Sequence, residues 1–189
     1  MTDPPPRAVV LVEGESDRNA LAVLAARRGR DLDAEGVAVV PMGGAGNVGR
    51  FVDRYGPRGL NVRLAGLYDV GEAADFCRGL ARAGLVAPDG GHAALAGAGF
   101  RVCDRDLEDE LIRAVGPAEV EAVVEAEGDL RALRTLQKQA PWAGRPPQDQ
   151  LRRWMGAGAG RKARYATLLA EVVDLRRAPE ALDAVLADV

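Results

Sequence analysis

The chain has 189 residues, of which 48% are hydrophobic and 28% are charged, a composition typical of a soluble globular protein. Its net charge of −3 carries no overall polybasic signature, so any nucleic-acid-binding surface has to be local. Two cysteines and one histidine are too few for a Cys/His zinc cluster or a disulfide framework, which favours a reducing, cytoplasmic location. The N-terminus lacks a signal-peptide pattern, and no apolar run is long enough to suggest a membrane partner.

The first half of the chain alternates between strand and helix patterns after a Pro-rich lead. We expect residues 1–7 to be disordered. A continuous apolar run predicts a buried parallel strand at 9–12, and further strands are predicted at 37–41, at 62–69, which ends in an acid, and at 100–103. Amphipathic patterns predict helices at 16–30, 47–55 and 72–83, followed by a Gly/Ala/Pro-rich loop at 84–99. This order is typical of an α/β fold with a mostly parallel sheet and helices on both faces.

The second half of the chain shows helix patterns without strand patterns. The predicted helices are 107–115, 117–127, 130–139, 148–155, 161–173 and 179–187, with a break at 141–147. We therefore expect an α/β core over residues 8–105. An all-helical C-terminal extension over residues 106–189 is expected to complete the site.

Acidic residues follow the predicted strands, at the edge where parallel sheets carry their functional groups. The clusters are Glu13 with Asp17, Asp69 with Glu72, and Asp104 with Asp106 and Glu108. Carboxylates that converge in this way favour Mg²⁺ or Mn²⁺, and a pair of such ions can serve phosphodiester cleavage. Helix capping is the alternative for any single cluster. Glu13 is the exception, because it precedes the cap position.

A glycine-rich segment offers a competing interpretation. Gly44, Gly46 and Gly49 fit a G-x-G-x-x-G pattern after a predicted strand, and Asp69 follows at the end of the next strand. This spacing is typical of a dinucleotide-binding, Rossmann-like enzyme. However, the pattern follows the second strand rather than the first, and Pro41 and Met42 lengthen the turn. A simple tight turn into a helix explains the glycines at least as well.

The segment "VVLVEGESDRNAL" resembles the opening motif of TOPRIM domains, the metal-dependent fold shared by topoisomerases, primases and OLD-family (overcoming-lysogenization-defect) nucleases. The segments "GLYDVGEAADF", "DRDLEDELIRAVG" and "GRKARYATLLAEV" are similar to the TOPRIM half of OLD-like ATP-dependent endonucleases. The resemblance covers about residues 8–175. It implies a TOPRIM-like fold and a metal-dependent DNA phosphodiester hydrolase, a nicking or cutting endonuclease that uses Mg²⁺ or Mn²⁺.

The resemblance also implies roles for individual residues. Glu13 corresponds to the family glutamate that binds metal and acts as general acid or base, and Lys162 to the basic residue beside the cleaved phosphate. The implied metal ligands are Glu13, Asp17, Asp69, Glu72 and Glu108.

The sequence departs from the family pattern in two respects. Gly71 stands where the second aspartate of Asp-x-Asp is expected, and Glu72, one residue later, is its candidate replacement. No Walker A motif is present, so an ATP-driven activity is expected to need a separate ATPase subunit as partner. A catalytically weakened TOPRIM module that binds nucleic acid or such an ATPase is therefore an alternative function.

A local basic region balances the acidic clusters. Residues 145–177 contain eight Arg and Lys residues against three acidic residues. We expect phosphate contacts from Arg152, Arg153, Arg161, Lys162 and Arg164.

Several other side chains are expected to serve the fold rather than a ligand. Trp154 and Tyr165 fit core packing better than base stacking. Gly156, Gly158 and Gly160 suggest a flexible hinge before Arg161, which would let Lys162 swing towards the metals. His92 is expected on the surface without a partner, and Cys103 in a buried strand.

Overall fold

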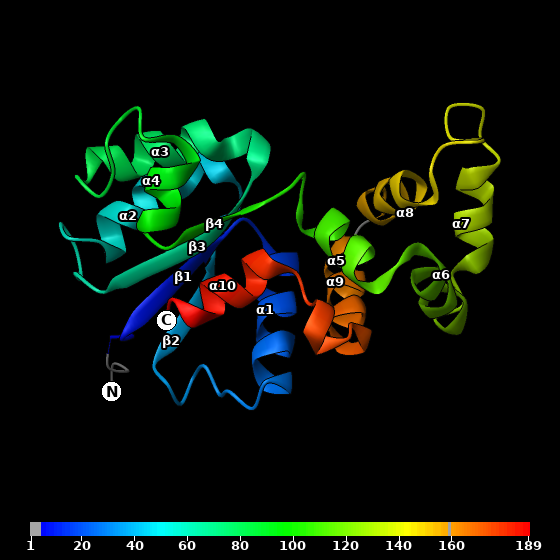
Figure 1. Ribbon diagram of the computed structural model, residues 1–189, viewed down its shortest axis with the longest axis horizontal. Coiled ribbons are helices and arrows are strands. Elements are labelled where there is room, and N and C mark those ends of the chain that lie inside the picture. The colour runs from blue at the N-terminus through cyan, green and yellow to red at the C-terminus, as the bar shows by residue number, and fades with distance from the viewer. Residues whose placement is uncertain (1–4, 159) are drawn as a thin grey trace.

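The computed structural model describes residues 5–158 and 160–189, so most of the predicted disordered lead lies outside the described residues. Figure 1 shows a single parallel sheet with the strand order β2-β1-β3-β4. The strands are β1 (Ala8–Val12), β2 (Val37–Pro41), β3 (Arg63–Asp69) and β4 (Phe100–Cys103). The predicted α/β fold with a parallel sheet is confirmed. Among the described residues, no helix combines the length and apolar composition that a membrane span requires.

The strand register brings the carboxyl ends of the strands to one edge of the sheet. Val12 pairs with Pro41, and Asp69 pairs with Cys103. All five residues of β1 are buried, which explains why its sequence is a continuous apolar run rather than an alternating one. The segments that follow β1, β3 and β4 therefore leave the sheet side by side.

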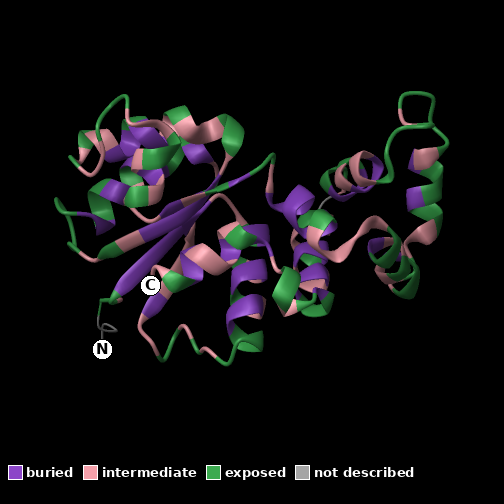
Figure 2. Cartoon of the chain, viewed as in Figure 1, coloured by how far each residue is buried: buried purple, intermediate pink, exposed green. Residues whose placement is uncertain are grey.

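Helices cover both faces of the sheet, as Figure 2 shows by the buried strands between them. Val10 and Val12 of β1 face a core formed with α1 (Glu15–Arg27) and the later helices of the chain. Val9 and Leu11 face the opposite core. That core is built with α2 (Val48–Tyr55), α3 (Ala73–Arg82) and α4 (Gly91–Gly97).

Helix α4 corrects one prediction, because it lies inside the segment that was expected to be a loop. The sequence of α4 is rich in alanine, which is the best helix former. Its single large apolar side chain, Leu95, is fully buried against the same core as Phe100. A single buried leucine gives too little periodicity to indicate a helix from sequence, but it is enough to anchor a short helix to the sheet.

The second half is helical. Its helices are α5 (Leu107–Val115), α6 (Pro117–Ala126), α7 (Leu130–Gln137), α8 (Pro147–Gly156), α9 (Arg161–Val172) and α10 (Glu180–Ala187). The chain also contains short 3₁₀ turns. Two lie in the first half, η1 (Ala45–Asn47) and η2 (Val70–Glu72), and η3 (Leu175–Arg177) lies between α9 and α10. Helix α9 is joined to α1 by Arg27, whose Nη1 donates to the carbonyl oxygens of Ala170 at 2.8 Å and Val173 at 2.7 Å. Helix α10 returns to the sheet, while α6 and α7 lie far from it (Figure 1).

The apolar core continues from the sheet into the helical part. Val12, Leu107, Trp154 and Tyr165 belong to one cluster of buried residues. The division at residue 105 therefore describes a change of secondary structure within a shared core, and whether the two parts act as separate domains stays a prediction.

Candidate functional site

Three carboxylates meet at the carboxyl edge of the sheet. Glu13 follows β1 directly, Asp69 is the last residue of β3, and Glu72 ends the 3₁₀ turn after β3. Each offers an oxygen atom, and these oxygens all lie within 4.8 Å of one another. The parallel register produces this meeting, because β1 and β3 are neighbours with Leu11 opposite Gly66, so that both chains leave the sheet at the same edge.

The proximity of these groups disturbs their protonation. Burial, followed by the charges of Glu13, Asp106, Asp17 and Glu72, raises the pKa of Asp69 to about 8. Burial and the neighbouring Glu13 carboxylate raise the pKa of Glu72 to about 7. In addition, Glu72 Oε2 is buried and has no hydrogen-bond partner among the described residues. A divalent cation fits this arrangement, because it would offset the repulsion and use the unpaired oxygen.

Asp17 lies beside this cluster with a second, structural task. Its side chain is almost fully buried in the first turn of α1, and its Oδ2 accepts a hydrogen bond from the backbone amide of Gly14 at 2.9 Å. Burial raises the pKa of Asp17, while the Gly14 amide and the positive charge of Lys162 act in the opposite direction. The capping interpretation thus applies to Asp17 and not to Glu13. Glu15 is exposed and forms an ion pair with Arg18 instead.

Glu108 and Lys162 form the other half of the site. Glu108 is 1% exposed in the first turn of α5, and its Oε2 lies 2.9 Å from Lys162 Nζ. Its Oε1 is buried without a hydrogen-bond partner among the described residues. Helix α5 begins here because Asp106 caps it, with Oδ1 accepting from the Asp109 amide at 2.9 Å.

The pKa values of this pair shift in the same direction. Burial raises the pKa of Glu108, although the charge of Lys162 opposes the shift. Burial alone would lower the pKa of Lys162, but the carboxylates of Glu108, Asp17 and Asp106 outweigh it and raise the pKa. Lys162 is therefore a permanent cation at neutral pH.

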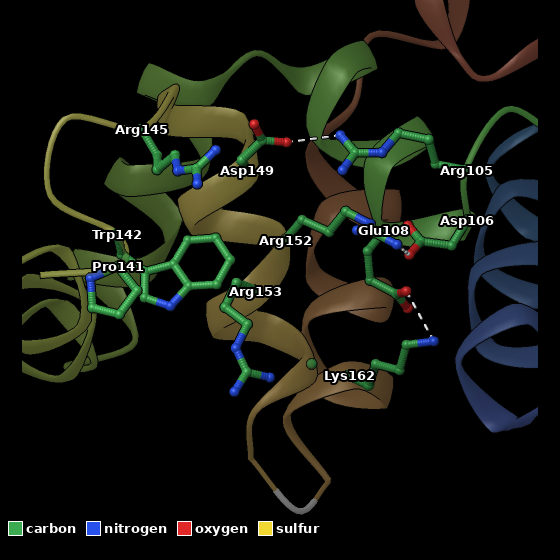
Figure 3. Close-up of a pocket in the computed structure, with 11 residues that line it drawn as sticks. Arg105, Asp106, Glu108, Pro141, Trp142, Arg145, Asp149, Arg152, Arg153 and Lys162 are labelled. Atoms are coloured by element: carbon green, nitrogen blue, oxygen red, sulfur yellow. Dashed lines mark hydrogen bonds and ion pairs between the residues drawn. The ribbon is translucent and has the colours of Figure 1, made fainter. Parts of the chain in front are cut away.

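Two hollows meet at Lys162. The smaller one, of about 350 Å³, has Glu13, Glu15, Asp17 and Lys162 as its charged lining residues, with glycine, serine and alanine residues between them. The larger one, of about 510 Å³, is called here the cationic groove and is shown in Figure 3. Its charged and aromatic lining residues are Arg105, Asp106, Glu108, Trp142, Arg145, Asp149, Arg152, Arg153 and Lys162. Lys162 thus connects the carboxylates of the sheet edge to a surface suited to phosphates.

The structure brings some of the predicted phosphate-binding residues into the groove and directs others elsewhere. Arg152 and Arg153 line the groove, and Arg152 Nε donates to Asp106 Oδ2 at 2.6 Å. Arg161 instead lies over the Trp154 ring at 4.3 Å and donates to the Trp154 carbonyl oxygen at 2.8 Å. Arg164 forms ion pairs with Glu127 and Asp129. Arg161 and Arg164 do not line the groove.

The aromatic residue of the groove is one that sequence reasoning missed. Trp154 and Tyr165 are buried and pack edge to face with ring centroids 5.0 Å apart, so the prediction of core packing is confirmed. Trp142 is half-buried and lines the groove instead. The available signal was its place in a Pro/Gly-rich break between helices, where an aromatic side chain has few apolar neighbours in sequence. Arg105 and Arg145 were likewise missing from the predicted set.

The glycine-rich segment positions Glu13. The amides of Gly43 and Gly44 donate to the Glu13 carbonyl oxygen at 3.0 and 3.1 Å. Both glycines have positive φ, 71° and 113°, a conformation that other residues rarely adopt. These contacts support the tight-turn interpretation, because amides bonded to Glu13 are not free to bind a pyrophosphate.

The remaining predictions concern single residues. Cys103 is buried in β4, as expected. His92 is exposed, as expected, but it has a partner, because α4 brings its Nδ1 within 2.8 Å of the Tyr68 hydroxyl. The predicted hinge includes residue 159, which lies outside the described residues. Gly160, with a φ of 73°, precedes α9.

Comparison with known proteins supports the resemblance. Residues 6–70 match the family model of the "Overcoming lysogenization defect protein-like, TOPRIM domain". No curated protein sequence matches the chain. The C-terminal region of the Xanthomonas campestris pv. campestris OLD protein is 25% identical, with a TM-score of 0.78 over 97% of this chain and 92% of that chain. The C-terminal region of the Burkholderia pseudomallei OLD protein is 22% identical, with a TM-score of 0.74 over 97% and 96%.

Proposed function

Because residues 6–70 match the OLD-like TOPRIM family model, we propose that this chain is a divalent-cation-dependent phosphodiester hydrolase that nicks or cuts DNA. The observation that supports this function is the meeting of Glu13, Asp69 and Glu72 at one sheet edge, with oxygens within 4.8 Å. The cationic groove adjoins these carboxylates through Lys162. Negative groups that bind a cation thus lie next to positive groups that bind phosphate.

The carboxylates divide into a core set and supporting residues. Glu13, Asp69 and Glu72 would hold Mg²⁺ or Mn²⁺, the charge of Asp17 acts on Asp69, and Glu108 interacts with Asp17 and Lys162 rather than with the three clustered carboxylates. When bound, the cation would supply positive charge that polarises the phosphodiester and stabilises its developing negative charge. The unpaired buried oxygens of Glu72 and Glu108 support this assignment.

Glu72 is the proposed replacement for the missing second aspartate. Its side chain reaches the cluster although it stands one position later in the sequence. The extra methylene of glutamate and the 3₁₀ turn over Val70–Glu72 account for this reach.

Side chains of this protein would bind the DNA phosphates and transfer the proton. Lys162 Nζ, held by Glu108, would donate a hydrogen bond to a non-bridging oxygen of the scissile phosphate. Arg152 and Arg153 would bind the flanking phosphates along the groove. Glu13 would also serve as general acid or base, since it belongs to the carboxylate cluster and lines the smaller hollow.

The test is the conversion of supercoiled plasmid to nicked or linear DNA in Mg²⁺ or Mn²⁺. We expect activity in the wild type, its loss in Glu13→Ala, and its retention in Glu15→Ala. Glu15 is the matched control, because its exposed side chain pairs with Arg18 and is not one of the three clustered carboxylates, although it lines the same hollow. Nicking that persists in Glu13→Ala, or no nicking by the wild type with either cation, would contradict the proposal.

A second candidate is a TOPRIM module that binds DNA or a partner ATPase without cutting. The observation that favours it is Gly71 at the position of the expected aspartate. This candidate predicts DNA binding without cleavage in any divalent cation. It also predicts that Gly71→Asp introduces cleavage into a protein that otherwise lacks it.

A further inference from the structure

Trp142 is presented to the cationic groove on a fixed backbone. Its amide donates to the Gln139 carbonyl oxygen at 2.8 Å, and its carbonyl oxygen accepts from Gln150 Nε2 at 2.8 Å and from the Arg145 amide at 3.1 Å. The side chain packs partly against the main apolar core and partly lines the groove. These hydrogen bonds already order the backbone around Trp142. A ligand that contacts the indole therefore binds without the entropy cost of ordering a loop.

The two arginines beside Trp142 are the cations of the groove that have no carboxylate partner among the described residues. Arg145 and Arg153 are exposed and form no ion pair with a carboxylate among the described residues, and the Arg153 guanidinium carbon lies 6.0 Å from the Trp142 ring centroid. By contrast, Arg105 lies 2.8 Å from Asp149, and Arg152 lies 2.5 Å from Asp106. Figure 3 shows Trp142, Arg145 and Arg153 grouped on one side of the groove, with Lys162 and Glu108 on the other.

A half-buried indole that lines a groove beside two guanidinium groups without carboxylate partners, one of them over its ring, has a specific ligand chemistry. Every nucleobase can stack on an indole, but only when it has left the duplex stack, because paired bases cover each other's faces. Guanidinium groups beside the ring bind the phosphates that flank such a base. A duplex without unpaired bases would use the arginines and leave Trp142 without a partner.

We propose that Trp142, Arg145 and Arg153 form a subsite for an unpaired nucleotide, which makes DNA with a single-stranded segment the preferred ligand of the groove. The base stacks on Trp142, and its phosphates contact Arg145 and Arg153. Because Lys162 lines the same groove, the unpaired nucleotide is held close to the proposed cleavage centre. This inference describes a substrate preference only if the proposed function is correct, and in that sense it rests on the proposed function. The binding of an unpaired nucleotide can be measured without cleavage.

The experiment measures binding in the Glu13→Gln background with Mg²⁺, so that DNA is not cut. The probes are a fluorescein-labelled oligothymidylate and a blunt duplex of the same length. We expect tighter binding of the oligothymidylate, and a loss of about 5- to 150-fold in its affinity upon Trp142→Ala, with little change for the duplex. Trp142→Phe keeps an aromatic ring and should retain most of the affinity, which separates stacking from a folding defect.

The salt dependence of binding separates the roles of the three residues. Arg145→Gln and Arg153→Gln should each reduce the slope of log affinity against log salt by about 0.7 for the single strand, whereas Trp142→Ala should leave that slope unchanged. The matched controls are Leu60→Ala, an exposed apolar residue elsewhere, and Arg50→Gln, an exposed arginine on α2. Both controls should bind like the parent.

The outcomes distinguish this inference from the proposed function. Equal binding of the oligothymidylate by Trp142→Ala and Leu60→Ala would overturn the subsite, even if the wild type nicks plasmid. A preference for the oligothymidylate that Trp142→Ala removes would support the subsite, even if no cleavage is found with either cation. Equal affinity of the parent for the single strand and the duplex would also overturn it.

Discussion

Lys162 on α9 and Glu108 on α5 form an ion pair in which one partner is buried and the other is not. The Nζ–Oε2 distance is 2.9 Å, and the side chains are 48% and 2% exposed, respectively. The buried carboxylate depends on the lysine for compensation, while the lysine keeps access to solvent. The pair therefore holds a cation at the junction of the carboxylate cluster and the cationic groove.

Removal of Lys162 should affect stability and activity together. Lys162→Met leaves the Glu108 carboxylate uncompensated, so the free energy of unfolding should fall by about 1–3 kcal/mol. Cleavage should fall by about 10²–10³-fold, because a donor to the phosphate is lost. Urea denaturation and plasmid nicking measure the two effects. The double variant Glu108→Gln with Lys162→Met should regain stability without activity, and wild-type cleavage by Lys162→Met would contradict the assigned role.

The raised pKa values of the carboxylate cluster predict a pH dependence of stability in the metal-free protein. In the folded state the pKa is about 8 for Asp69 and about 7 for Glu72, against ordinary values of 3.8 and 4.5, mainly because both groups are buried. The folded protein binds these protons more tightly than the unfolded chain does. The stabilising contribution is therefore fully present below the ordinary pKa values and is lost as the pH rises through about 7 to about 8.

Thermal melts in EDTA test this dependence. The melting temperature of the wild type should fall relative to that of Asp69→Asn as the pH increases from about 5 to about 8. Mn²⁺ should raise the wild-type melting temperature more at the higher pH, since the cation competes with protons for the same oxygens. Identical dependence of the melting temperature on pH for the two proteins in EDTA would show that Asp69 does not have the raised pKa that this prediction requires.

Whether Glu72 replaces the missing aspartate can be tested by moving the carboxylate from position 72 to position 71. A Cβ atom at Gly71 would meet nothing within 4 Å, so an aspartate fits there. Glu72→Ala should lose cleavage and the stabilisation by Mn²⁺, and the addition of Gly71→Asp should restore both in part. Gly71→Ala in the same background is the control and should restore neither. Full activity of Glu72→Ala would show that Glu72 does not replace the aspartate.

The strands and most helices of this protein are predictable from local patterns. The four strands appear in the sequence within one residue of their observed bounds, and β1, which is buried along its whole length, is the one marked by a continuous apolar run. Helix α4 was not predictable, because it depends on one contact of Leu95 with the core. Its formation also gives His92 a partner that no local pattern indicates.

The sequence by itself determined which residues stand at the carboxyl ends of the strands, and therefore that Glu13 and Asp69 lie at this sheet edge. The reason is that strand ends and their register follow from short-range hydrophobic patterns and parallel pairing. Only the tertiary structure decided which aromatic and basic residues are available to a ligand. Trp154 is covered and Trp142 is open, and Arg164 is neutralised by acids more than thirty positions away while Arg153 is not. These outcomes depend on long-range contacts between helices, which the local sequence does not specify; the Pro/Gly-rich break around Trp142 was the one local indication.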